Sequence, residues 1–165
     1  NYIDTAPGYA DSEAVLGRIL KDIDAPLVIS TKLGGRPQPF DAQDKDALRR
    51  SVETSLRLLR RDQIDILMIH EPDRPGQYDW FSDWGRFYGP VCDLLAELKS
   101  EGIIRFTGLG GTTAYTLAHI VATGEHEVVL RYRPPGWCAG LGVSLGSVLA
   151  CGVLAWRRRR GDAAS

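Results

Sequence analysis

Short apolar runs alternate with helical patterns over the first 130 residues, and this alternation constrains the fold more than any other feature. The apolar runs are rich in β-branched residues, which is typical of strands. They occupy residues 2–3, 27–31, 64–69, 103–107 and 127–130. The segments between them carry apolar residues at helical spacing, as in Leu48, Val52, Leu56 and Leu59. Such alternation predicts an α/β fold with parallel strands, either an open sheet or a (β/α) barrel.

The ends of the helices can also be predicted. Asp44 or Asp46 is expected to cap the helix that follows residues 27–31. Gly102 is expected to end the helix that precedes residues 103–107. About five strands and four helices result, which is fewer than the eight pairs that close a barrel.

Polar side chains stand at or just beyond the ends of the first three apolar runs. They are Asp4, Tyr9, Lys32 and His70. Because parallel strands all end on one face of such a fold, these four side chains are expected to converge. A carboxylate, a phenol, an ammonium and an imidazole gathered on one face predict a site of proton transfer.

Each of the four residues has an expected role. Tyr9 is the candidate proton donor, and a neighbouring Lys32 is expected to lower the phenol pKa from its ordinary value of about 10. Asp4 is expected to pair with Lys32, and His70 to hydrogen-bond the substrate oxygen or to relay the proton. Taken singly, each residue also fits an ordinary role, such as a loop aromatic, a cap, a solvated charge or a strand-end histidine. Their joint placement favours a site.

These residues closely resemble the signature of the aldo-keto reductases. The matching motifs are residues 4–9, Ser12-Glu13 with Leu16-Gly17, Ser30-Thr31-Lys32, Asp65 with His70, and residues 94–108. The resemblance covers about residues 1–130. It implies a partial (β/α)8 TIM-type barrel that lacks the first strand and the C-terminal strands. It also implies that Asp4, Tyr9, Lys32 and His70 are catalytic and that NADPH (NADP) is the cofactor.

Two further contacts are expected where the chain departs from that family. After the strand that corresponds to residues 103–107, many members have Ser-Asn, which holds the nicotinamide carboxamide. This chain has Gly108 to Thr113 at that place, so the hydroxyl of Thr112 or Thr113 is the expected cofactor contact. The glycines themselves favour an ordinary tight strand-to-helix turn. The aromatic loop 77–88 is expected either to wall a substrate pocket, with Trp80 as the substrate contact, or to pack onto the barrel.

Charge and cysteine content restrict the partners and the compartment. Residues 1–130 hold 14 Lys and Arg against 20 Asp and Glu. An acidic body argues against a nucleic-acid partner. The three cysteines show neither C-x-x-C pairing nor zinc spacing, which predicts a reducing cytoplasm and no metal site. Cys92 is expected to be a small core residue.

Residues 131–165 differ in character from residues 1–130 and are expected to form a separate, divergent segment rich in Gly, Ala and Arg. Residues 138–156 carry no charge and precede four arginines at 157–160, which fits a transmembrane helix with a basic flank. An out-of-frame reading of a GC-rich gene is favoured over such a helix, and a buried hairpin that completes the domain is the third interpretation. We expect a cytoplasmic protein, with membrane tethering through residues 138–156 as the alternative.

The predicted reaction is the NAD(P)H-dependent interconversion of a carbonyl compound (an aldehyde, ketone or sugar) and an alcohol. A small molecule is therefore the expected partner, with the oligomeric state left open. An incomplete barrel with open sheet edges is expected to impair this activity and to weaken cofactor binding. A Schiff-base barrel aldolase that uses Lys32 is one alternative. A non-catalytic relative that binds a cofactor or a partner is the other.

Overall fold

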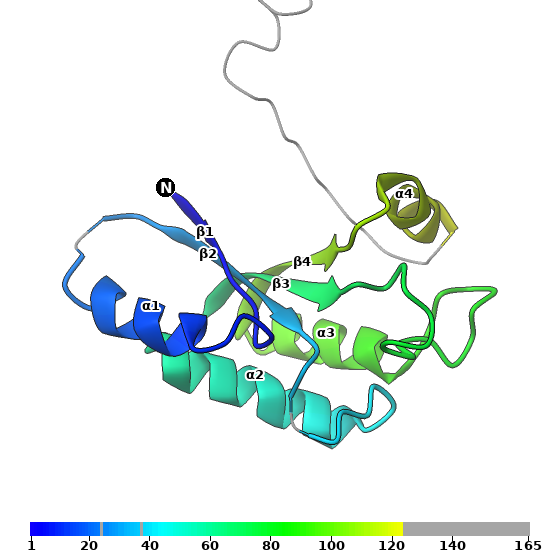
Figure 1. Ribbon diagram of the computed structural model, residues 1–165, viewed down its shortest axis with the longest axis horizontal. Helices are drawn as coiled ribbons and strands as arrows, with labels where there is room; N and C mark the ends of the chain where they lie inside the picture. The colour runs from blue at the N-terminus through cyan, green and yellow to red at the C-terminus, as the bar shows by residue number, and fades with distance from the viewer. Residues whose placement is uncertain (24, 37, 124–165) are drawn as a thin grey trace, which may run out of the picture. The chain divides into compact units, whose positions relative to one another are not determined.

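The computed structural model describes residues 1–23, 25–36 and 38–123, which form four successive strand–helix units (Figure 1). The strands are β1 (Tyr2–Asp4), β2 (Val28–Leu33), β3 (Ile64–His70) and β4 (Ile104–Gly110). The helices are α1 (Ser12–Leu20), α2 (Lys45–Leu59), α3 (Pro90–Ser100) and α4 (Ala114–Thr123). They belong to a compact unit, Asn1–Val128. The predicted strand at 127–130 and the segment 131–165, including 138–156, lie outside the described residues.

The four strands form one parallel sheet in the order β1-β2-β3-β4. This order confirms the prediction of a parallel α/β fold. The register pairs Asp4 with Ser30, Lys32 with Met68, and His70 with Gly110. The ends of neighbouring strands therefore lie side by side, and the residues at those ends are brought to the same edge of the sheet.

Helices α1, α2 and α3 cover one face of the sheet (Figure 1). Alternate strand residues point toward them and are almost completely buried, as are the apolar stripes of the helices. The main core contains Leu33, Leu48, Val52, Leu67, Ile69, Leu94 and Leu98. Full burial of such a side chain contributes about 1.5–3 kcal/mol, so this core holds the strand ends in a fixed frame.

The opposite face of the sheet carries the other alternate side chains, among them Lys32. Tyr2, Val28 and Phe106 on this face are 52%, 37% and 54% exposed in the described part of the chain. A polar side chain such as Lys32 therefore projects toward the open side of the sheet, away from the helix-covered core.

Helices α1 and α2 approach each other closely at Gly17. A Cβ atom at this position would lie 2.0 Å from the carbonyl oxygen of Leu58. Only glycine permits this backbone contact, since any side chain would push the helices apart. The close packing fixes α1, and with it the loop between β1 and α1.

Both predicted helix ends are confirmed. Asp44 is the N-cap of α2, and its Oδ1 accepts a hydrogen bond of 2.9 Å from the backbone N–H of Ala47. Gly102 follows α3 with φ of +74°, the left-handed conformation that favours glycine after a helix.

Loss of the Asp44 cap is expected to lower the free energy of unfolding. Asp44→Ala removes the acceptor for the Ala47 N–H and should cost about 1 kcal/mol. Asp44→Asn is the matched control, because asparagine caps equally well and should unfold at the wild-type denaturant concentration. Urea unfolding of the three proteins measures the difference. Equal stability of the Ala and Asn variants would contradict the assignment.

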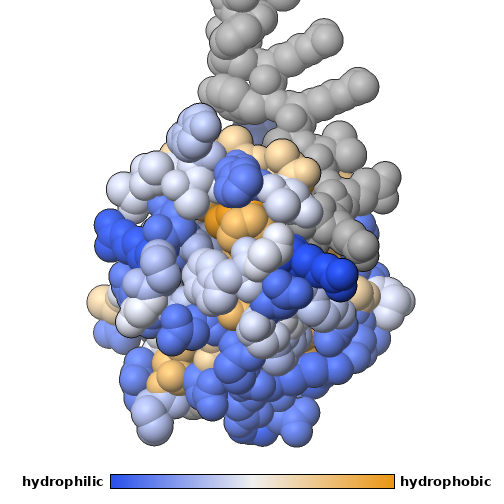
Figure 2. All heavy atoms as spheres, turned by 90° about the vertical axis from the view of Figure 1, so that its right-hand side faces the viewer, coloured by the Kyte–Doolittle hydropathy of each residue, from blue (hydrophilic) through white to orange (hydrophobic). Residues whose placement is uncertain are grey.

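Figure 2 shows the side of the molecule toward which the arrows of β3 and β4 point in Figure 1. This side is mainly hydrophilic, with apolar residues in small patches. Within the described ranges, no helix is long and apolar enough to cross a membrane.

Candidate active site

The structure brings the four predicted residues together at the carboxyl ends of three neighbouring strands. Asp4 is the last residue of β1, Lys32 is the last but one of β2, and His70 is the last of β3. Tyr9 lies in the loop that joins β1 to α1. The parallel register thus produces the convergence that the sequence predicted.

Lys32 is held in place by two oxygens. Its ammonium donates hydrogen bonds to Asp4 Oδ2 at 2.7 Å and to the carbonyl oxygen of Thr5 at 2.8 Å. The other oxygen of Asp4 accepts from the Ser30 hydroxyl, which in turn accepts from the Tyr2 hydroxyl at 2.9 Å. Because Lys32 is only 5% exposed, its charge requires such partners. The expected pair with Asp4 is therefore present.

Tyr9 lies over this ion pair. The ammonium of Lys32 is 4.9 Å from the centre of the Tyr9 ring, within the range of a cation–π contact. The ring of His70 stands nearly perpendicular to that of Tyr9, with 5.9 Å between their centres. Tyr9 is 47% exposed, so a substrate can reach it from solvent.

His70 is fixed by the loop that follows β3. Its ring stacks on Tyr78 with 6.1 Å between centres, and its carbonyl oxygen accepts a hydrogen bond of 2.8 Å from the Trp80 indole N–H. Its Nδ1 atom is buried and finds no hydrogen-bond partner among the described residues. The imidazole is thus held in place by packing.

The surroundings of His70 favour its neutral form. Burial lowers its pKa from the ordinary value of 6.5, and the Lys32 ammonium lowers it further. The carboxylates of Glu71 and Asp4 act in the opposite direction with smaller effect. At neutral pH the imidazole therefore carries one N–H donor and one acceptor nitrogen.

This depressed pKa predicts how stability depends on pH. In the unfolded chain His70 takes up a proton near its ordinary pKa of 6.5, whereas the folded chain resists protonation until a lower pH. The contribution of His70 to the free energy of unfolding should therefore be constant above pH 6.5 and fall as the pH drops below 6.5. His70→Asn should flatten the fall, whereas His119→Asn, at an exposed histidine, should not. An NMR titration midpoint for His70 at or above 6.5 would contradict this.

Trp80 does not occupy the position expected of it. Its side chain is 0% exposed and packs against Phe40 and Tyr78, with ring centres at 5.3 and 5.6 Å. A fully buried side chain offers a substrate no surface, which corrects the prediction of a substrate contact. Trp80 supports His70 from within the core, and Tyr78 is the loop aromatic that reaches the site.

Thr112 and Thr113 form the turn between β4 and α4. Their backbone N–H groups donate to Asp73 Oδ2 at 3.0 and 2.6 Å, and the Thr112 hydroxyl accepts from Arg74 at 3.1 Å. Burial raises the pKa of Asp73, but these N–H donors outweigh it and lower the pKa overall. A Cβ at Gly111 would lie 2.2 Å from Asp73 Oδ1. Gly108 and Gly110 therefore belong to β4, and only Gly111 lies in the tight turn that Asp73 closes.

Sequence reasoning missed three residues that shape the site, namely Ser30, Asp73 and Tyr78. Ser30 could have been predicted, because residues two apart on a strand point to the same face and Lys32 was already expected at the site. Asp73 and Tyr78 lie in an irregular loop without periodicity, which carries no comparable signal.

The sequence model of the Aldo/keto reductase family matches residues 1–131. The chain belongs to the aldo/keto reductase family. This is a family of oxidoreductases, and the four strand–helix units match part of its TIM-barrel structures.

Three similar proteins illustrate the match. L-galactose dehydrogenase of Arabidopsis thaliana is 29% identical over 93% of this chain and 52% of its own. NADH-specific methylglyoxal reductase of Escherichia coli is 31% identical over 78% of this chain and 42% of its own. The structure of an aldo/keto reductase from Klebsiella pneumoniae in complex with NADP and acetate is 25% identical, with a TM-score of 0.54 over 75% of this chain and 38% of that one. The chain thus spans about half, or less, of the length of these relatives.

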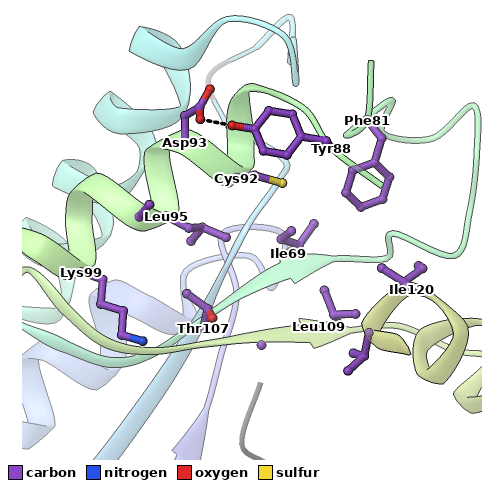
Figure 3. A pocket seen from close by; sticks show the side chains of 13 residues that line it. Ile69, Phe81, Tyr88, Cys92, Asp93, Leu95, Lys99, Thr107, Leu109 and Ile120 are labelled. Carbon is purple, nitrogen blue, oxygen red and sulfur yellow. Dashed lines mark hydrogen bonds between the residues drawn. The ribbon is translucent and has the colours of Figure 1, made fainter. Parts of the chain in front are cut away.

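A cavity of about 260 Å³ lies apart from the four residues, on the helix-covered side of the sheet (Figure 3). Its lining is largely apolar and includes Ile69, Phe81, Leu95, Leu109 and Ile120. Tyr88 donates a hydrogen bond to Asp93 at one end, and Lys99 stands at the other. Burial raises the pKa of the Cys92 thiol in its wall, so the thiol stays protonated at neutral pH.

Within the described ranges, no three His, Cys, Asp or Glu residues are grouped to hold a metal ion.

Proposed function

We propose that this chain carries the catalytic centre of an NAD(P)H-dependent oxidoreductase that interconverts a carbonyl compound and an alcohol. The observation that carries the proposal is the grouping of these side chains: the accessible ring of Tyr9 lies over the Lys32–Asp4 pair and beside His70. In this reaction class a reduced nicotinamide supplies the hydride, and the protein must supply a proton to the carbonyl oxygen.

Tyr9 is the proton donor in this proposal. Its phenol is an accessible hydroxyl of the cluster, and the Lys32 ammonium lies 4.9 Å from the centre of its ring. Asp4 and the Thr5 carbonyl hold that ammonium in place with two hydrogen bonds. A neutral His70 can donate a hydrogen bond to the substrate oxygen and orient it toward Tyr9.

The residues expected to bind the cofactor, Thr112 and Thr113, already make contacts within the described part of the chain. The backbone N–H groups of Thr112 and Thr113 are engaged with Asp73, and the Thr112 hydroxyl with Arg74. A carboxamide would have to compete with both contacts. We therefore expect weak binding of NADPH, measured as quenching or enhancement of its fluorescence on titration. Micromolar affinity would contradict this expectation.

The substrate class follows from the polar character of the site. Gly8 and Gly34 lie beside His70, and Tyr78 supplies one aromatic wall. Small polar carbonyl compounds suit such a site, and two of the relatives are named for L-galactose and methylglyoxal. We propose an aldehyde, ketone or sugar of this kind as the substrate.

The decisive experiment follows NADPH absorbance with methylglyoxal and with aldose sugars. The proposal expects loss of NADPH that requires both carbonyl and Tyr9, at a turnover below the ~1–10³ s⁻¹ usual for enzymes. Borohydride trapping of substrate on Lys32 would instead indicate an aldolase. The burial of the Lys32 amine and its two hydrogen bonds count against that chemistry. Carbonyl-independent or Tyr9-independent loss of NADPH would overturn the proposal.

A further inference from the structure

A buried carboxylate, that of Glu13, lies directly behind the candidate active site. Glu13, in the first turn of α1, is 2% exposed. It contacts Thr31, the residue before Lys32 on β2, and neighbouring strand residues point to opposite faces of a sheet. Glu13 therefore contacts β2 on the helix-covered face of the sheet, whereas Lys32 projects from the open face.

Glu13 joins three segments of the chain. Its Oε1 accepts a hydrogen bond of 2.7 Å from the Thr31 hydroxyl, and its Oε2 accepts from Nη2 of Arg36. The same Nη2 donates to the Ser55 hydroxyl of α2 at 2.9 Å. One carboxylate thus links α1 to β2 and to the loop after β2, and Arg36 extends the link to α2.

The residue beside Glu13 anchors the tyrosine loop. The Ser12 hydroxyl is 2.5 Å from that of Thr5, and Thr5 is the residue whose carbonyl oxygen accepts from Lys32. The backbone N–H of Ser12 donates to the carbonyl oxygen of Tyr9 at 3.0 Å. The start of α1 therefore fixes both the support of Lys32 and the end of the loop that carries Tyr9.

We propose that Glu13 is a positioning residue that sets the placement of Tyr9 over Lys32, an inference that rests on the proposed function. It acts through Thr31 on one side and through the start of α1 on the other. The physical reason is that a buried carboxylate with a donor on each oxygen is confined to one geometry, whereas the amide of glutamine has one oxygen and cannot accept from both donors in the same way. Misplacement of a catalytic group by about 1 Å can cost ~10²-fold in rate.

The test compares Glu13→Gln with Glu97→Gln in the full chain. Glu97 also pairs with cationic side chains, Lys45 and Arg49, but it is 43% exposed and lies on α3, away from the site. Glu13→Gln is expected to lower kcat for carbonyl reduction by about 10-fold or more with little change in KM, as expected of a placement error. Glu97→Gln should leave both constants at their wild-type values.

Two further variants separate positioning from loss of stability. Leu20→Ala removes a core side chain of α1 that touches none of the four catalytic residues, and it serves as a comparably destabilised protein. It should keep the wild-type kcat under conditions where it is folded. Thr31→Val removes one of the two donors to Glu13 and should lower kcat in the same direction as Glu13→Gln, which keeps the proposal testable if Glu13→Gln does not fold. A kcat reduction in Leu20→Ala equal to that in Glu13→Gln would overturn it.

A structural readout covers the case in which the wild-type chain shows no turnover, which would refute the proposed function alone. The nuclear Overhauser effect between the Tyr9 ring and the Lys32 methylenes reports their placement directly, since the ammonium lies 4.9 Å from the ring centre. It should weaken or vanish in Glu13→Gln and Thr31→Val and persist in Glu97→Gln. An unchanged signal in both Glu13→Gln and Thr31→Val would overturn the inference whether or not the chain is active.

Discussion

Tyr9→Phe is expected to lower kcat for carbonyl reduction by about 10²–10⁴-fold, the range that a general acid contributes. The substitution removes one oxygen atom and leaves the ring over the Lys32 ammonium, so the fold and the cation–π contact should survive. Substrate binding should change less than kcat, because the proton is needed in the transition state. Steady-state kinetics with NADPH and a small aldehyde would measure both constants.

The control for Tyr9→Phe is Tyr115→Phe. Tyr115 is 87% exposed on α4, and loss of its hydroxyl should leave the kinetics and the unfolding midpoint unchanged. A Tyr9→Phe protein with the kcat of the wild type would show that another group delivers the proton. His70→Gln would then become the next variant to assay.

Trp80→Ala is expected to lower the free energy of unfolding by about 3–5 kcal/mol, the usual cost of removing a buried Trp or Phe side chain. Trp80 is fully buried among Phe40, Tyr78 and the core, and its indole N–H satisfies the carbonyl oxygen of His70. The substitution opens a cavity and leaves that oxygen without its donor. Urea unfolding followed by circular dichroism would measure the loss.

Two variants distinguish the parts of this effect. Trp84→Ala removes the same volume at a position that is 39% exposed, so it should cost much less. Trp80→Phe retains most of the packing but not the hydrogen bond, and its cost should fall between that of wild type and Trp80→Ala. Stability of Trp80→Ala equal to that of Trp84→Ala would contradict the burial of Trp80.

Much of this structure was predictable because the governing signals are local. The capping of α2 by Asp44 depends on four consecutive residues, and the alternation of apolar runs and stripes indicates strands and helices one segment at a time. Parallel strands then place Asp4, Lys32 and His70 at one edge without any knowledge of the packing. The pairing of Lys32 with Asp4 follows, since a buried ammonium needs an anion.

The loop after β3 shows why the rest was not predictable. Six aromatic residues lie between residues 77 and 88, and nothing in their order indicates which one faces the core. The packing decides which aromatic residue faces the core. The indole of Trp80 fills the space beneath His70, whereas Tyr78 stacks on the His70 ring. Asp73 likewise reaches Thr112 and Thr113 through space, across 39 and 40 positions in the chain.

The sequence by itself determined the order of the strand–helix units and which four side chains meet at their ends, since both depend on short-range periodicity and strand direction. Only the tertiary structure decided how those side chains are held. The Lys32 ammonium lies under the Tyr9 ring and the Glu13 carboxylate lies behind β2 with Arg36, because helices α1 and α2 pack against one face of the sheet. Contacts of that kind depend on the distances between segments, which no local pattern of residues encodes.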